Sequence, residues 1–174
     1  HADLFHLYDK ANFQVICTNL TSVTNENPHW LQPTTQIKSI HGVKIGVIGL
    51  TAPFNDYYNL LGWHVDYAFP TLDTHLKQLK SLTDVIILLS HLGINEDRQI
   101  AEKYEDIDVI IGGHTHHLLH QEEVVNNSII TAAGKNCAYV GEVKLIWDHK
   151  SQRLIKKQAH TTNVTNLAKD LQTE

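Results

Sequence analysis

The chain has 174 residues, of which 42% are hydrophobic and 19% are charged, and this composition predicts one ordinary globular domain rather than a disordered chain. Its net charge of -5 at pH 7 argues against a broad nucleic-acid-binding surface, which needs a basic face. The longest unbroken apolar run, Val85 to Leu89, is far too short to cross a bilayer, so no membrane partner is expected.

The chain holds two cysteines, Cys17 and Cys137, and both lie in apolar, strand-like surroundings. Two cysteines do not make a disulfide framework, and reduced thiols are typical of intracellular proteins. No secretory signal is recognisable in the first residues. These observations predict a cytoplasmic protein.

Helical and strand periodicities alternate along the sequence. The predicted helices are residues 3–11, 71–82, 96–104 and a short terminal helix at 164–174. The predicted strands are residues 13–20, two strands within 35–50 hinged at His41-Gly42, then 84–89, 108–112, 122–125, 128–133, 139–147 and 153–161. Residues 21–35 and 51–70 are expected to form loops, the second of them rich in aromatic residues. Lys156 and Lys157 are expected on a solvated strand face.

This order predicts an α/β fold, with a βαβ unit in the middle and mostly β structure in the last third. Two all-apolar strands separated by a helix favour parallel pairing with a right-handed crossover. Binding sites in such sheets form beyond the carboxyl ends of the strands. His91 follows the first of these strands, and the stretch IIGGHTHH places His114, His116 and His117 after the second.

If the two strands are neighbours, His91 and the pair His114 and His116 emerge at the same edge of the sheet. Three convergent imidazoles suit a divalent ion such as Mn, Zn, Fe or Co, whereas Mg and Ca prefer oxygen ligands. The alternative is that His91 only bonds a strand end while the other two are exposed. The sequence alone leaves both readings open.

Two motifs, SHLG (residues 90–93) and DVIIGGHTHH (residues 108–117), resemble the calcineurin-like metallophosphoesterase superfamily, in particular its bacterial 5′-nucleotidase-like branch. The stretches VICTNL, GVKIGVIGLT and AGKNCAYVGEVKL are similar to the same branch, in the same order. The resemblance implies part of a four-layer α/β/β/α sandwich with a site for two divalent metal ions. It implies that His91 and His114 bind one metal and that His116 binds the other.

The family's early motifs, Asp-x-His, Gly-Asp and Asn-His-Glu, do not occur ahead of the SHLG and GGHTHH elements in the places where the family has them, and we expect them to precede His1. We therefore expect a single partial catalytic domain whose N-terminal half precedes His1. Such a segment, taken alone, is expected to self-associate through exposed strand edges. No residue of the segment itself is assigned as the catalytic acid.

Two classes of function remain from the sequence. The first is an enzyme, a metal-dependent hydrolase of nucleotides or other phosphoesters, to which this chain contributes the C-terminal part of the catalytic domain. The second is a non-catalytic metal-binding or interaction module that retains the fold. Which of the two applies to residues 1–174 alone is not decided by the sequence.

Overall fold

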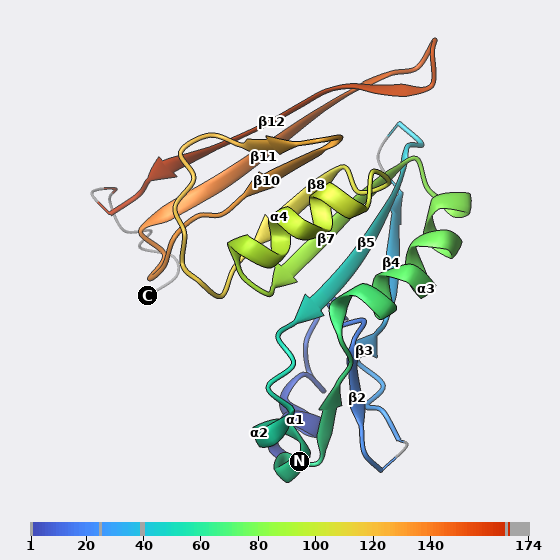
Figure 1. Ribbon diagram of the computed structural model, residues 1–174, viewed down its shortest axis with the longest axis vertical. Coiled ribbons are helices and arrows are strands. Elements are labelled where there is room, and N and C mark those ends of the chain that lie inside the picture. The colour runs from blue at the N-terminus through green and yellow to red at the C-terminus, as the bar shows by residue number, and fades with distance from the viewer. Residues whose placement is uncertain (1, 25, 39–40, 166, 168–174) are drawn as a thin grey trace.

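A six-stranded sheet forms the centre of the computed structural model, which describes residues 2–24, 26–38, 41–165 and 167 (Figure 1). Its strands, in spatial order, are β4 (Thr34–Lys38), β5 (Lys44–Thr51), β7 (Val85–His91), β8 (Val109–Gly112), β10 (Ser128–Thr131) and β9 (Glu123–Val125). The four middle strands run parallel, and β4 and β9 pair antiparallel at the two edges. The predicted α/β class and the predicted parallel pairing are confirmed.

Two helices, α3 (Ala68–Leu82) and α4 (Ile94–Lys103), cover one face of this sheet (Figure 1). Alternate residues of the parallel strands point to this face, because successive side chains of a strand leave on opposite sides. The main core therefore joins apolar strand residues to apolar helix residues: Ile48, Leu50, Ile86, Leu88, Ile110 and Ile130 from the sheet, and Leu72, Leu76, Leu79, Ile94, Ile100 and Ala101 from the helices.

A long antiparallel hairpin, β11 (Tyr139–Asp148) and β12 (Arg153–Asn163), packs against the other face. A second, smaller core joins Val109 and Ile129 of the sheet to Ala159 of the hairpin. The hairpin covers only part of this face, since Leu89 and Ile111 stay 39% and 40% exposed. These two residues are partners in the register between β7 and β8.

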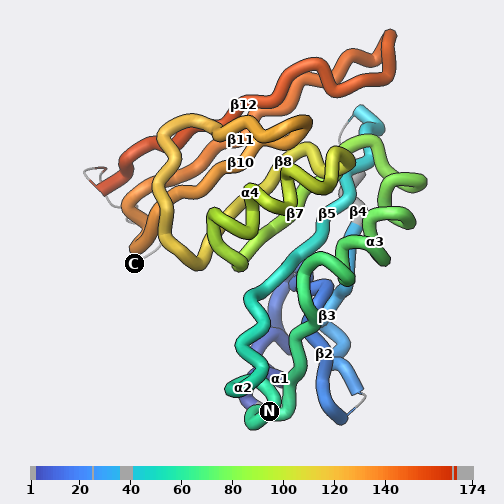
Figure 2. The backbone as a smooth tube through the Cα atoms, viewed as in Figure 1, coloured from blue at the N-terminus to red at the C-terminus, as the bar shows by residue number. Residues whose placement is uncertain are grey.

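The N-terminal part of the chain lies beyond the carboxyl end of β5 (Figure 2). It consists of short elements: α1 (Ala2–Leu7), β1 (Val15–Ile16), β2 (Leu20–Ser22), β3 (Leu31–Gln32), α2 (Asn55–Tyr58), a 3-10 turn η1 (Asn59–Leu61) and β6 (Trp63–Val65). Strand β1 pairs with β3, and β2 pairs with β6. These elements bring the aromatic segment after β5 next to the N-terminal segment.

Two predictions for this region are wrong in detail. The single strand predicted at 13–20 is limited to Val15–Ile16, and a second strand begins at Leu20, with the buried Asn19 between them. Its amide donates to the carbonyl oxygens of Thr51 and Asp66, both at 2.9 Å, and its oxygen accepts from the Thr51 N–H at 3.0 Å. The aromatic segment predicted as a loop contains α2, η1 and β6.

Further expectations concern the chain ends, the thiols and membrane crossing. Most of the terminal helix predicted at 164–174 lies outside the described residues. Cys17 and Cys137 are both free, the first half-buried and the second exposed. Among the described residues, no helix combines the length and apolarity needed to cross a membrane.

Candidate metal centre

The pairing of β7 with β8 brings two of the predicted histidines to one edge of the sheet. Ser90 lies opposite Gly112 in this parallel register, so His91 at the end of β7 lies beside the loop that follows β8. The rings of His91 and His114 have centroids 5.0 Å apart and planes inclined by 62°. Strand order alone, which the sequence pattern predicts, accounts for this juxtaposition.

The loop after β8 has an unusual backbone that turns its histidines toward this edge. His114 and His116 have φ angles of 68° and 56°, in the left-handed region that side chains other than glycine and asparagine rarely adopt. The glycine before them allows a close approach, because a Cβ at Gly113 would lie 3.2 Å from Nδ1 of His91. The loop therefore packs directly on the His91 ring.

His116 is exposed. It still acts electrostatically: burial lowers the pKa of His91 below its ordinary value, and the neighbouring charges of His114 and then His116 lower it further. Within the described ranges, no group of three or more His, Cys, Asp or Glu side chains is gathered closely enough to hold a metal ion. The structure thus brings together His91 and His114 and leaves His116 at the rim.

Phe54 is a neighbour of the histidine pair that the sequence analysis did not identify. Its ring centroid lies 5.6 Å from that of His114, and 49% of the side chain remains exposed. It stands between the end of β5 and α2, in the aromatic segment. The only signal in the sequence is its position shortly after a parallel strand, at the edge where sites form.

A hollow of about 310 Å³ runs along the uncovered face of the sheet and reaches His91. Thr51, Leu89 and Ile111 line it together with Cys17. Burial raises the pKa of the Cys17 thiol to about 11, so this sulfur carries its proton near neutral pH and is a poor metal ligand. Of the two paired histidines, only His91 lines this hollow, whose other walls are mostly apolar.

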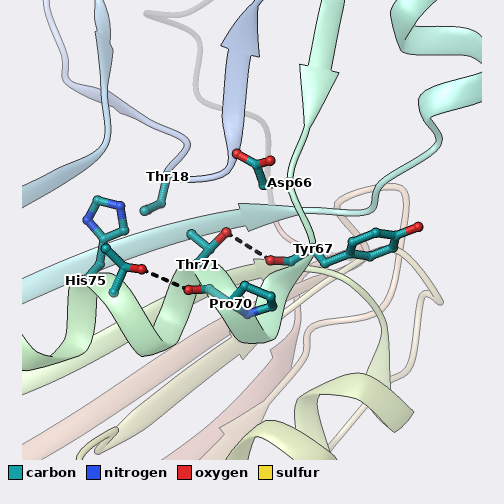
Figure 3. Close-up of a pocket in the computed structure, with 7 residues that line it drawn as sticks. Thr18, Asp66, Tyr67, Pro70, Thr71 and His75 are labelled. Carbon is teal, nitrogen blue, oxygen red and sulfur yellow. Dashed lines mark hydrogen bonds between the residues drawn. The ribbon is translucent and has the colours of Figure 1, made fainter.

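A separate polar hollow of about 380 Å³ lies at the start of α3 (Figure 3). Asp66, Tyr67 and His75 line it, and none of the three predicted ligands does. The Thr71 hydroxyl donates to the Tyr67 carbonyl oxygen at 2.9 Å, in addition to the Thr71 backbone N–H, which donates to the same oxygen. This hollow is not part of the histidine site.

The chain belongs to the calcineurin-like phosphoesterase family, whose model matches residues 3–118. The family assignment made from the SHLG and GGHTHH motifs is therefore confirmed. Members of this family generally use divalent metal ions.

Several known proteins are similar to this chain. It is 39% identical over 165 residues to the uncharacterized metallophosphoesterase YunD of Bacillus subtilis (strain 168), a match that covers 94% of this chain and 36% of YunD. It is 36% identical over 118 residues to the trifunctional nucleotide phosphoesterase protein YfkN of the same organism, covering 64% of this chain and 8% of YfkN. The structure of the Thermus thermophilus sulfate thiohydrolase SoxB matches with a TM-score of 0.79 at 18% identity, over 94% of this chain and 30% of SoxB.

The chain spans only about a third of the length of YunD and of SoxB. The likeness to SoxB is one of fold. Since the same fold carries an enzyme named for another substrate, fold alone does not define the reaction, and the site must be argued from its residues.

Proposed function

We propose that the protein is a metal-dependent phosphoester hydrolase of the 5′-nucleotidase-like kind and that nucleotides are its substrate class. The proposal depends on one observation: paired imidazoles, His91 and His114, at the carboxyl edge of a parallel sheet. The name of YfkN, a nucleotide phosphoesterase, supports the substrate class.

The donors at this edge fit a transition-metal ion. Imidazole nitrogens suit Mn, Zn, Fe and Co, and a ligand must be free of its proton. The lowered pKa of His91 keeps that ring neutral near pH 7. In this proposal His91 and His114 would hold one metal ion, and His116 would approach a second.

Divalent metal ions at such a centre supply Lewis-acid stabilisation of the negative charge on phosphoryl oxygens. The chain itself supplies orientation. The strand register fixes the spacing of the two rings, and Gly113 lets the second loop lie against the first. The half-exposed Phe54 contacts the His114 ring and would limit access of water and substrate to that ring.

The test is hydrolysis of nucleoside monophosphates and of a generic phosphodiester by the protein at its natural length, with Mn²⁺ supplied. We expect His114→Ala to abolish metal-dependent turnover, and the matched variant His149→Ala to leave it unchanged. His149 is an exposed histidine in the turn between β11 and β12, on a different part of the fold.

Two outcomes would contradict the proposal. One is a protein that is inactive with every divalent metal tried. The other is a His114→Ala variant as active as its parent. The first result would favour the non-catalytic metal-binding or interaction module, and the second would show that His114 is not a ligand that the reaction needs.

A further inference from the structure

The first turn of helix α4 contacts the loop that carries His91. Asp97, in this turn, accepts a hydrogen bond at Oδ1 from the hydroxyl of Ser90, the residue directly before His91. The same hydroxyl oxygen accepts a hydrogen bond from the backbone N–H of Leu92 at 3.3 Å. One hydroxyl thus ties together the residues on both sides of His91, and Asp97 holds that hydroxyl.

The same carboxylate also touches the strand that leads to His114. A Cβ added at Gly112, the last residue of β8, would lie 2.5 Å from Oδ2 of Asp97. The carboxylate therefore packs directly against the backbone of β8. It bridges the ends of the two strands from which the paired histidines emerge.

A third contact anchors the second loop to the same turn. The Thr115 hydroxyl, between His114 and His116, accepts a hydrogen bond from the backbone N–H of Ile94 at 3.2 Å. This hydroxyl serves as the cap of α4, because Gly93 at the cap position has no side chain to do so. Both histidine loops are thus attached to the start of one helix.

Packing alone does not account for a carboxylate in this place. Asp97 is 1% exposed, and among the described residues its Oδ2 has no hydrogen-bond partner. Burial raises the pKa of Asp97 to about 6, although the bond from Ser90 opposes this shift. A buried carboxyl group with one unbonded oxygen destabilises a fold, so an apolar residue would serve better if only stability mattered.

We propose that Asp97 is a positioning residue, which fixes His91 relative to His114 by bonding Ser90 and by packing against Gly112. The inference rests on the proposed function, in which the two histidines are metal ligands. Partners behind metal ligands orient the ligand rings, and their removal typically weakens metal affinity by about 10- to 100-fold.

The test is calorimetric titration of Mn²⁺ into the protein at its natural length. We expect Asp97→Ala and Ser90→Ala each to raise the Kd for Mn²⁺ by about tenfold or more. The Kd of the double variant for Mn²⁺ should be no higher than that of the weaker-binding single variant, because both substitutions break the same hydrogen bond. Asp97→Asn should stay within about threefold of the parent, because its amide oxygen can still accept from Ser90.

Ser128→Ala is the matched control for a loss of stability. Ser128 is fully buried at the start of β10, and its hydroxyl donates to the Ile107 carbonyl oxygen at 2.7 Å. It lies at the end of the parallel sheet opposite the histidines. Its removal should lower the unfolding midpoint and leave the affinity for Mn²⁺ unchanged.

Two failures can be told apart. If the parent protein binds Mn²⁺ and Asp97→Ala binds it equally well while melting at a lower temperature, Asp97 is only structural and this inference is overturned. If the parent protein binds no divalent metal, the proposed function fails, and the inference that rests on it fails with it.

Discussion

The imidazole rings of His91 and His114 lie with their centroids 5.0 Å apart, although His91 ends β7 and His114 lies in the loop after β8. Backbone pairing sets this distance, since Ser90 and Gly112 are register partners in neighbouring parallel strands. His91 is held in a hydrogen-bonded strand, and His114 follows two residues after the end of its neighbour, so a rigid element supports each ring, as a ligand set needs.

Metal binding at this pair should stabilise the folded protein. Free Mn²⁺ at one hundred times its Kd would contribute about 2.7 kcal/mol to the free energy of unfolding. For a domain of this size, that corresponds to a rise in melting temperature of about 5–10 °C. Thermal unfolding followed by circular dichroism, with Mn²⁺ and then with excess chelator, measures the rise and its reversal.

The histidine variants decide whether this rise belongs to the candidate centre. His91→Ala and His114→Ala should show little or no rise with Mn²⁺, whereas His149→Ala should respond as the parent does. A rise of equal size in all three variants would place the stabilising metal elsewhere on the protein.

Asp97 should make stability depend on pH. Its pKa rises from 3.8 to about 6 on folding, mainly because the group is buried. The folded state therefore holds the proton more tightly, so the contribution of Asp97 to stability is greatest below pH 4 and is lost as pH rises through 6. Across this window the parent should lose about 3 kcal/mol relative to Asp97→Asn, which has no proton to release.

Urea unfolding of both proteins at several values of pH between 3.5 and 7.5 measures this difference. The comparison cancels the other titrating groups, because the two proteins differ at one position only. A difference in unfolding free energy that stays constant over the whole range would show that Asp97 titrates normally.

The centre of the fold follows from the sequence, for a physical reason. The run from Val85 to Leu89 is continuously apolar, as expected of a strand covered on both faces, and the helical spacing of Ile94, Ile100 and Ala101 gives α4 one buried side. Parallel pairing then follows, and with it the meeting of His91 and His114. In this part of the chain, the periodicity of apolar residues is enough to predict which strands pair.

Other contacts could not be predicted, because local periodicity does not specify them. Asp97 stands between Glu96 and Arg98 and resembles an ordinary charged helix residue, although its spacing of three from Ile94 and from Ile100 places it on the buried side. Phe54 belongs to a segment without periodicity. Its approach to His114 depends on how α2 and β6 pack, which no local rule specifies.

Gly49 should be intolerant of a side chain. A Cβ at this position in β5 would lie 2.3 Å from the carbonyl oxygen of Ile16, which is backbone and cannot rotate away. Gly49→Ala should therefore force β1 away from the sheet and lower the free energy of unfolding by about 2 kcal/mol or more. Chemical denaturation monitored by tryptophan fluorescence measures the loss.

Gly141→Ala provides the comparison for this strand substitution. A Cβ at Gly141 would meet the Ala133 Cβ at 3.7 Å, an ordinary van der Waals contact. Alanine is less costly than glycine in a strand, so this variant should be as stable as the parent or slightly more so. Equal destabilisation by both substitutions would mean that the N-terminal segment does not pack on β5 as described.

Lys157 should contribute to stability, whereas its neighbour Lys156 should not. The sequence predicts a solvated strand face for both, but the structure corrects this for Lys157: its side chain is 16% exposed, and its Nζ lies 3.2 Å from Asp108 Oδ1. Strand alternation explains the difference, since successive residues of β12 face opposite sides.

Lys157→Ala leaves the half-buried Asp108 without this partner and should lower the free energy of unfolding by about 1–3 kcal/mol. The exposed Lys156→Ala should lower it by less than about 0.5 kcal/mol. Urea unfolding of the two variants measures both values, and equal losses would show that the ion pair does not form in solution.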